Sequence, residues 1–144
     1  MNNRIEIKGK YTSRPLKFKK YPKHVGVPLI DIVLKNPTTG EIAQTTGEFM
    51  LDTGACISII NKKYQSFIEK MNPVDELNIQ YGSEKIVKAS TYKVIMIIKG
   101  KEIESTVAYD PDSPFLLLGH FDFFENKSYV LFDSTLKQYR IVKN

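Results

Sequence analysis

The most informative stretch of this chain is FMLDTGACISII, residues Phe49 to Ile60. Apolar residues lead into Asp52, a Thr-Gly-Ala turn follows, and an apolar run then resumes. This order predicts a turn between two buried strands, with a carboxylate at the start of the turn. Such an aspartate often does no more than form the turn, since its side chain accepts a hydrogen bond from a nearby backbone N–H. The alternative is that Asp52 carries chemistry.

Length and composition indicate one ordinary globular domain. The chain has 144 residues, of which 42% are hydrophobic and 26% charged. It has no apolar run near the roughly 20 residues needed to span a bilayer, and its N-terminus lacks the apolar segment of a secretory signal. The single cysteine, Cys56, excludes an internal disulfide and is typical of a reducing compartment. We therefore expect a cytoplasmic protein that does not enter a membrane.

The net charge of +5 is concentrated near the N-terminus. Residues 1–24 hold eight basic residues and one acidic residue, whereas the rest of the chain holds 13 basic and 15 acidic residues. We predict a basic arm over residues 1–25 and one main domain over residues 26–144. The arm could contact phosphate, but a solvated leader is the commoner meaning of such a run, and nucleic acid is not an expected partner.

Hydrophobic alternation predicts a mostly β domain. Strands are expected over residues 27–35, 41–51 and 56–61, and hairpins over residues 77–89, 92–109 and 128–142. Residues 114–119 form a short, wholly apolar segment. Two short helices are expected, one over residues 62–71 with Tyr64, Phe67, Ile68 and Met71 on one face, and one after residue 119. So many strands with so little helix favour a compact, barrel-like sheet.

A second motif raises the significance of the first. Three leucines, Leu116 to Leu118, end in Gly119, 67 residues after Asp52. An Asp-Thr-Gly-Ala turn, a helix, a hairpin with a glycine turn, a hydrophobic-hydrophobic-Gly motif and a terminal strand follow one another in order. This combination resembles the retropepsin-like aspartic proteases over roughly residues 28–142, and the cellular DNA-damage-inducible-type branch more than the retroviral one. The resemblance implies a closed, acid-protease-type barrel that forms a homodimer.

The chemistry of the motif can be stated from the residues. Hydrolysis of a peptide bond by water needs a base that takes a proton from the water and an acid that protonates the carbonyl oxygen. Two carboxylates held about 3 Å apart do both, because they share one proton. The chain has one Asp-Thr-Gly turn, and Asp110, Asp112, Asp122 and Asp133 lack that context. A C2 homodimer would supply the second carboxylate, Asp52 of the other copy.

The resemblance assigns further roles around Asp52. Thr53 would brace the two active-site loops across the dimer axis, Gly54 would let the substrate backbone approach, and Ala55 completes the loop. Leu117, Leu118 and Gly119 would pack behind that loop. The hairpin turn at Tyr81, Gly82 and Ser83 would be a flap that closes over a bound peptide. No cofactor is implied.

Two positions depart from the retroviral pattern. Retroviral enzymes have an acid soon after the Asp-Thr-Gly-Ala turn and an arginine after the hydrophobic-Gly motif, and here these positions hold Cys56 and His120. The ion pair is absent, so support for the loop or for the dimer must come from elsewhere. We expect Cys56 to be a small buried residue rather than a redox switch, and Phe121, Phe123 and Phe124 to pack in the core. Cys56, His24 and His120 lack the spacing of metal ligands, so no metal is expected.

The sequence therefore predicts a homodimeric aspartic endopeptidase, in which Asp52 of each subunit activates water. Its substrates would be extended peptides or proteins with hydrophobic residues flanking the scissile bond. The alternative is a homodimeric peptide-binding or regulatory module of the same fold with little or no turnover. A serine-type mechanism has no support, since no GxSxG motif occurs.

Overall fold

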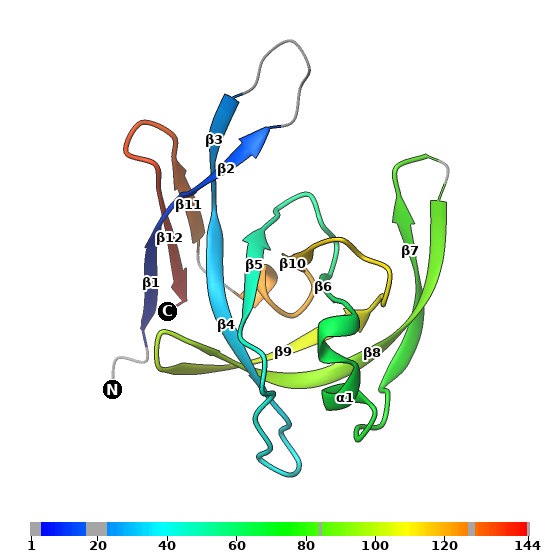
Figure 1. Cartoon of the computed structure of the whole chain (residues 1–144). Helices are drawn as coiled ribbons and strands as arrows, with labels where there is room; N and C mark the ends of the chain where they lie inside the picture. Colours follow the sequence, from blue (N-terminus) through cyan, green and yellow to red (C-terminus); the bar gives the residue numbers. More distant parts are fainter. Residues whose placement is uncertain (1–3, 17–22, 84, 127–128, 144) are drawn as a thin grey trace.

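A closed six-stranded barrel forms the body of the molecule (Figure 1). The computed structural model describes residues 4–16, 23–83, 85–126 and 129–143. In order around the barrel lie β4 (Leu29–Lys35), β5 (Gly47–Leu51), β10 (Leu116–Leu118), β6 (Ser58–Ile60), β9 (Lys101–Tyr109) and β8 (Lys85–Ile98), and β4 pairs again with β8 to close it. The predicted mostly β barrel is thereby confirmed.

The β7–β8 hairpin extends beyond the barrel. Among the residues that the structure describes, strand β7 (Asp75–Tyr81) pairs only with β8, so it continues the sheet without joining the closed ring. In Figure 1 this hairpin rises at one side of the molecule, away from β5 and β10. The second predicted hairpin, β8 with β9, turns at Lys99 and Gly100, both of which have positive φ values.

Alternating side chains fill the barrel. On β4 the residues Ile30, Ile32 and Leu34 are buried, and on β8 Val94, Met96 and Ile98 are buried, which is the period of two expected of strands with one face in a core. Burying each such side chain contributes about 1.5–3 kcal/mol.

Outside the barrel, the two ends of the chain share a sheet. Strand β1 (Ile5–Lys10) pairs with β12 (Gln138–Lys143), which also pairs with β11 (Tyr129–Asp133). Ile7 and Ile141 join the main core. Strands β2 (Thr12–Leu16) and β3 (Lys23–Val27) form a separate hairpin, and Arg14 forms an ion pair with Glu48 on β5. The predicted arm thus contains β1, β2 and much of β3, while the domain boundary at residue 25 stays a prediction.

The helices are shorter than predicted. Residues 62–71 form a 3₁₀ turn, Lys62–Tyr64, followed by one α-helical turn, α1 (Gln65–Ile68). The predicted face is present, with Tyr64, Phe67 and Ile68 buried. After Gly119, the described residues contain a 3₁₀ turn, Phe124–Asn126, and no α-helix, so the second predicted short helix is present only as this single turn. Asp122 has a φ of 58°, which interrupts helical backbone geometry there.

Two predicted strands are also shorter than expected. Residues 41–46 make only an isolated bridge at Ile42, and β5 begins at Gly47. Strand β6 begins only at Ser58, so Cys56 lies in a loop and Ile57 makes only an isolated bridge, to Phe121. In the part of the chain that the structure describes, no helix is long and apolar enough to cross a membrane.

Candidate active site

Asp52 starts a tight turn at the end of β5. Its side-chain Oδ1 accepts a hydrogen bond from the Gly54 N–H at 2.9 Å, and its carbonyl accepts one from the Ala55 N–H at 3.1 Å. Its own N–H donates to the Leu118 carbonyl at 3.0 Å. The half-buried carboxylate is therefore fixed by its own turn and by strand β10, while Thr53 and Gly54 are exposed.

Strand β10 connects the two strands that flank this turn. It pairs in parallel with β5, placing Leu118 beside Leu51, and antiparallel with β6, placing Leu117 beside Ile59. The predicted proximity of the two sequence motifs is thus present in the structure. Leu118 is fully buried behind the turn.

Gly119 has no room for a side chain. A Cβ atom there would lie 2.5 Å from the carbonyl carbon and oxygen of Ile57 and 2.8 Å from the carbonyl oxygen of Ala55. Its N–H donates to the Ser58 hydroxyl at 3.1 Å. The glycine of the second motif therefore allows the backbone after β10 to pass against the loop that follows Asp52.

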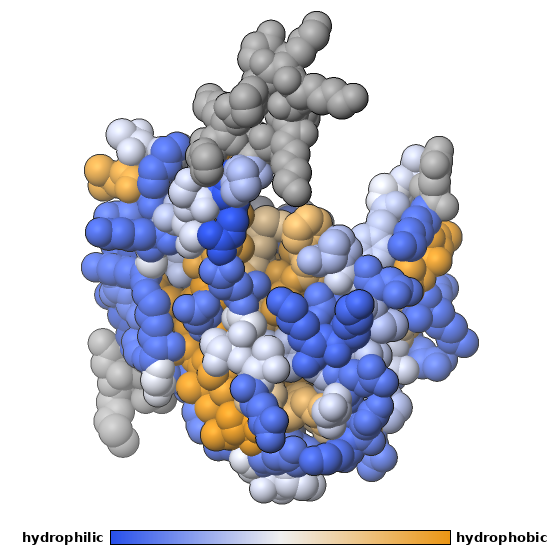
Figure 2. Space-filling model, viewed as in Figure 1, coloured by the Kyte–Doolittle hydropathy of each residue, from blue (hydrophilic) through white to orange (hydrophobic). Residues whose placement is uncertain are grey.

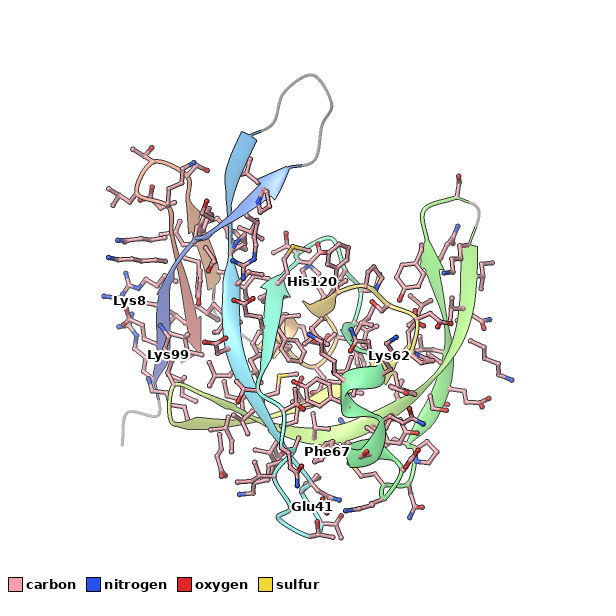
Figure 3. All side chains as sticks on the ribbon, viewed as in Figure 1. Lys8, Glu41, Lys62, Phe67, Lys99 and His120 are labelled. Atoms are coloured by element: carbon pink, nitrogen blue, oxygen red, sulfur yellow. The ribbon has the colours of Figure 1, made fainter. Side chains whose placement is uncertain are left out.

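The residues after Gly119 continue this contact. The backbone N–H of His120 donates to the Ala55 carbonyl at 3.0 Å, and that of Phe121 donates to the Cys56 carbonyl at 2.7 Å. The imidazole Nε2 of His120, labelled in Figure 3, lies 2.5 Å from the Thr53 carbonyl oxygen. The sequence pattern marked His120 only as the residue that stands where retroviral enzymes have an arginine, and as a weak candidate metal ligand, so this contact was not predicted. Its position directly after the glycine was the available signal.

An apolar cleft of about 870 Å³ opens above Asp52. Its floor is a second, smaller hydrophobic cluster that includes Ile57, Ile59 and Leu117, and Ile79 of β7 belongs to the same cluster. Figure 2 shows a hollow with hydrophobic residues at its base beside the raised β7–β8 hairpin. The lining includes six of the predicted site residues, Asp52, Gly54, Ala55, Leu117, Tyr81 and Gly82, but not Thr53, Leu118, Gly119 or Ser83.

Polar groups surround the cleft at the base of the hairpin. Asp75 and Glu76, both exposed, begin β7. Lys93 donates to the Asp122 carboxylate at 2.8 Å, and the Thr106 hydroxyl donates to the same oxygen at 2.7 Å. The cleft thus combines an apolar floor with charged groups at its edge.

Tyr81 joins the hairpin to the barrel. Its hydroxyl donates to the Asp110 carboxylate at 2.8 Å, and Asp110 is almost fully buried in the loop after β9. Partial burial, followed by this hydrogen bond, raises the pKa of Tyr81 to about 12. Gly82 has a φ of 64° at the exposed turn of the hairpin. The hairpin is confirmed, and its function as a flap stays a prediction.

Two expectations about nonpolar side chains near the site are corrected. Cys56 is exposed and lines the cleft, because strand β6 begins only two residues later and Cys56 still belongs to the loop. Phe123 and Phe124 are buried as expected, but Phe121 is 50% exposed and lines the cleft as well. No group of three His, Cys, Asp or Glu side chains suited to a metal occurs among the described residues, and the side chain of His24 lies outside them.

Comparisons with known proteins identify the fold. No protein-family model and no curated protein sequence matches the chain. Among solved structures, a retropepsin-like aspartic protease from Rickettsia conorii is similar, with 18% identity, 98% of this chain and 93% of that chain covered, and a TM-score of 0.59. A foamy viral protease-reverse transcriptase bound to an RNA/DNA hybrid shows 19% identity, 65% and 11% coverage, and a TM-score of 0.48. The first of these similarities, together with the closed barrel, shows that the chain has a retropepsin-like fold.

Proposed function

We propose that the protein is an aspartic endopeptidase whose active form is a homodimer with one catalytic Asp52 in each subunit. The observation that carries this proposal is the placement of Asp52. Its carboxylate lies on a turn that is fixed by β10 and lines an apolar cleft. An aspartate that only formed the turn would not need the second motif packed behind it or a cleft in front of it.

The proposed mechanism requires two copies of this turn. One carboxylate of the pair, ionised, takes a proton from water while the other, protonated, donates to the peptide carbonyl oxygen. Each subunit provides one Asp-Thr-Gly turn, so a two-fold axis beside Asp52 would complete the pair. The exposure of Thr53 and Gly54 supports this arrangement, because both residues are accessible to a second subunit.

The substrate would be an extended peptide with hydrophobic side chains beside the scissile bond. The cleft floor offers Ile57, Ile59 and Leu117 to such side chains. Main-chain hydrogen bonds would hold the extended peptide, as in strand addition, and the β7–β8 hairpin would close over it as a flap. Cytoplasmic location and similarity to the DNA-damage-inducible-type branch remain predictions from the sequence.

The test compares two aspartates that make the same kind of turn. Asp133 Oδ1 accepts hydrogen bonds from Thr135 and Leu136 N–H groups at 3.0 and 2.9 Å, much as Asp52 Oδ1 accepts one from Gly54, but Asp133 does not line the cleft. We expect Asp52→Asn to lower the cleavage rate of a peptide library by about 10³-fold, and Asp133→Asn to leave it unchanged. Rates would be measured from acidic to neutral pH by mass spectrometry.

Two results would contradict the proposal. One is that both variants cleave as fast as the natural protein, which would make Asp52 a turn-forming residue. The other is that the natural protein forms a dimer and binds peptides but cleaves none at any pH, which is the behaviour of the peptide-binding alternative.

A further inference from the structure

One peptide group in the active-site turn is held at both of its ends. The carbonyl of Thr53 and the N–H of Gly54 belong to the same peptide unit. The N–H donates to Asp52 Oδ1 at 2.9 Å, and the carbonyl oxygen lies 2.5 Å from His120 Nε2. A carbonyl oxygen can only accept, so His120 must be the donor through an Nε2–H. The order is therefore imidazole N–H, peptide group, carboxylate.

Such a chain of hydrogen bonds has a direct electrostatic consequence. Hydrogen bonds in series polarise one another, so a donor at the carbonyl makes the N–H of the same peptide group a stronger donor. It also fixes the plane of the peptide, because rotating that plane would break both bonds. His120 thus acts on the Asp52 carboxylate through a single peptide group, without touching it.

His120 is exposed, but its backbone is fixed by hydrogen bonds and its ring has one aromatic neighbour. The backbone N–H of His120 donates to Ala55, and its carbonyl accepts from the N–H of Glu125 at 3.0 Å. Its ring lies edge-on to the buried Phe124 ring, with 5.8 Å between the ring centroids. His120 therefore binds the carbonyls on both sides of Gly54, one through its backbone and one through its side chain.

We infer that His120 is a positioning residue for Asp52, and that its imidazole supplies the support that the missing ion pair would give to the turn. In naming Asp52 as the group that is positioned for catalysis, this inference rests on the proposed function. The claim that His120 orients the Thr53–Gly54 peptide group does not depend on the proposed function. The inference and the proposed function can therefore be tested separately.

The test uses a matched pair of substitutions. His120→Gln keeps an N–H donor at a reach close to that of Nε2, whereas His120→Met has a similar length and no donor. In the labelled protein, NMR would give the exchange rate of the Gly54 amide hydrogen, and peptide cleavage would give kcat and KM. We expect His120→Met to speed Gly54 exchange and to lower kcat by about tenfold each, with KM changed less than about twofold. His120→Gln should restore both toward natural values.

Three results would overturn the inference. These are unchanged Gly54 exchange in His120→Met, equal impairment of the Gln and Met variants, and a loss confined to KM. If the Met variant does not fold, as judged by its amide spectrum, His120→Phe replaces it, because Phe keeps an aromatic edge against Phe124 and also lacks the donor. If neither the natural protein nor any variant cleaves peptides, the proposed function fails. The Gly54 exchange rates would still decide whether His120 orients the Thr53–Gly54 peptide group.

Discussion

A methyl group at Gly119 would meet the backbone of Ile57 at 2.5 Å, closer than any relaxed contact allows. Gly119→Ala must therefore push β10 away from the loop after Asp52. We predict a loss of about 1–3 kcal/mol in the free energy of unfolding and a fall in kcat of about 10²-fold, because a small displacement of a catalytic group costs that much. Chemical denaturation and peptide cleavage would measure the two effects.

Gly40→Ala is the control for this prediction. Gly40 has a φ of 75° but nothing within 4 Å of the added methyl, so its substitution strains the backbone without a clash. It should cost about 1 kcal/mol of stability and leave kcat unchanged. Equal losses of kcat in the two variants would show that Gly119 has no particular relation to the site.

The Tyr64 hydroxyl is buried and has no hydrogen-bond partner among the described residues. An unpaired buried polar group costs free energy, so Tyr64→Phe should raise the free energy of unfolding by about 1 kcal/mol. The Tyr139 hydroxyl, by contrast, donates to the Leu29 carbonyl at 3.1 Å, and Tyr139→Phe should lower stability by about the same amount. Urea unfolding of both variants tests this; a loss of stability in Tyr64→Phe would contradict it.

At the residue scale, the sequence pattern predicted the Asp52 turn, because a turn depends on a short motif with strong local geometry. The packing of Gly119 behind that turn was implied by the resemblance to retropepsin-like proteases and not by the local pattern. The sequence pattern did not predict the contact between His120 and Thr53, which joins residues 67 positions apart through one imidazole tautomer. Exposure of Cys56 was missed for a related reason. Apolar neighbours suggest a strand, but where the strand starts is set by pairing with other strands.

At the scale of elements, the hydrogen bond from Tyr81 to Asp110 ties the β7–β8 hairpin to the barrel. Tyr81→Phe should free the end of β7, so amide hydrogens of residues 79–81 should exchange about tenfold faster. Tyr92→Phe on β8 removes a hydroxyl for which the described part of the chain shows no hydrogen bond, and should leave these rates unchanged. Equal exchange in the natural protein and Tyr81→Phe would mean that the bond does not hold the hairpin.

The same bond gives a dependence on pH. The folded-state pKa of Tyr81, about 12, lies above the usual value of about 10, so its contribution is complete below pH 10 and is lost as pH rises toward 12. The difference in stability between the natural protein and Tyr81→Phe should therefore shrink over that range. A difference that stays constant would contradict this assignment.

Strand prediction succeeded where alternation is long, as in β4, since one of its faces lies in the core. Strand β8 runs unbroken from Lys85 to Ile98 and is shared by both hairpins, so the predicted break between residues 89 and 92 is wrong. The predicted helices were longer than the observed ones. The segment 62–71 has the right apolar face, but Asn61 caps a 3₁₀ turn, so that only four residues remain α-helical before Pro73. After Gly119, the positive φ of Asp122 interrupts helical geometry, and among the described residues only the 3₁₀ turn Phe124–Asn126 follows.

At the scale of the whole molecule, the chain has one Asp-Thr-Gly turn and a cleft that Asp52 lines from one side. The closure of the barrel and the order of its strands depend on pairings between residues far apart in sequence, such as β4 with β8. Local sequence patterns therefore indicated a barrel but not the order of its strands. We propose that two subunits together form one active site. This predicts that an inactive subunit lowers the activity of its natural partner, which a site contained in one subunit would not show.

The most direct test mixes natural protein with a ninefold excess of Asp52→Asn and allows the subunits to exchange. If each site needs Asp52 from both subunits, random pairing leaves about one tenth of the natural subunits with a natural partner, and the cleavage rate per natural subunit should fall to about one tenth. The Asp133→Asn variant keeps Asp52, so when it is added in the same amount the cleavage rate per total subunit should stay unchanged. A rate per natural subunit that stays constant as Asp52→Asn is added would contradict the account.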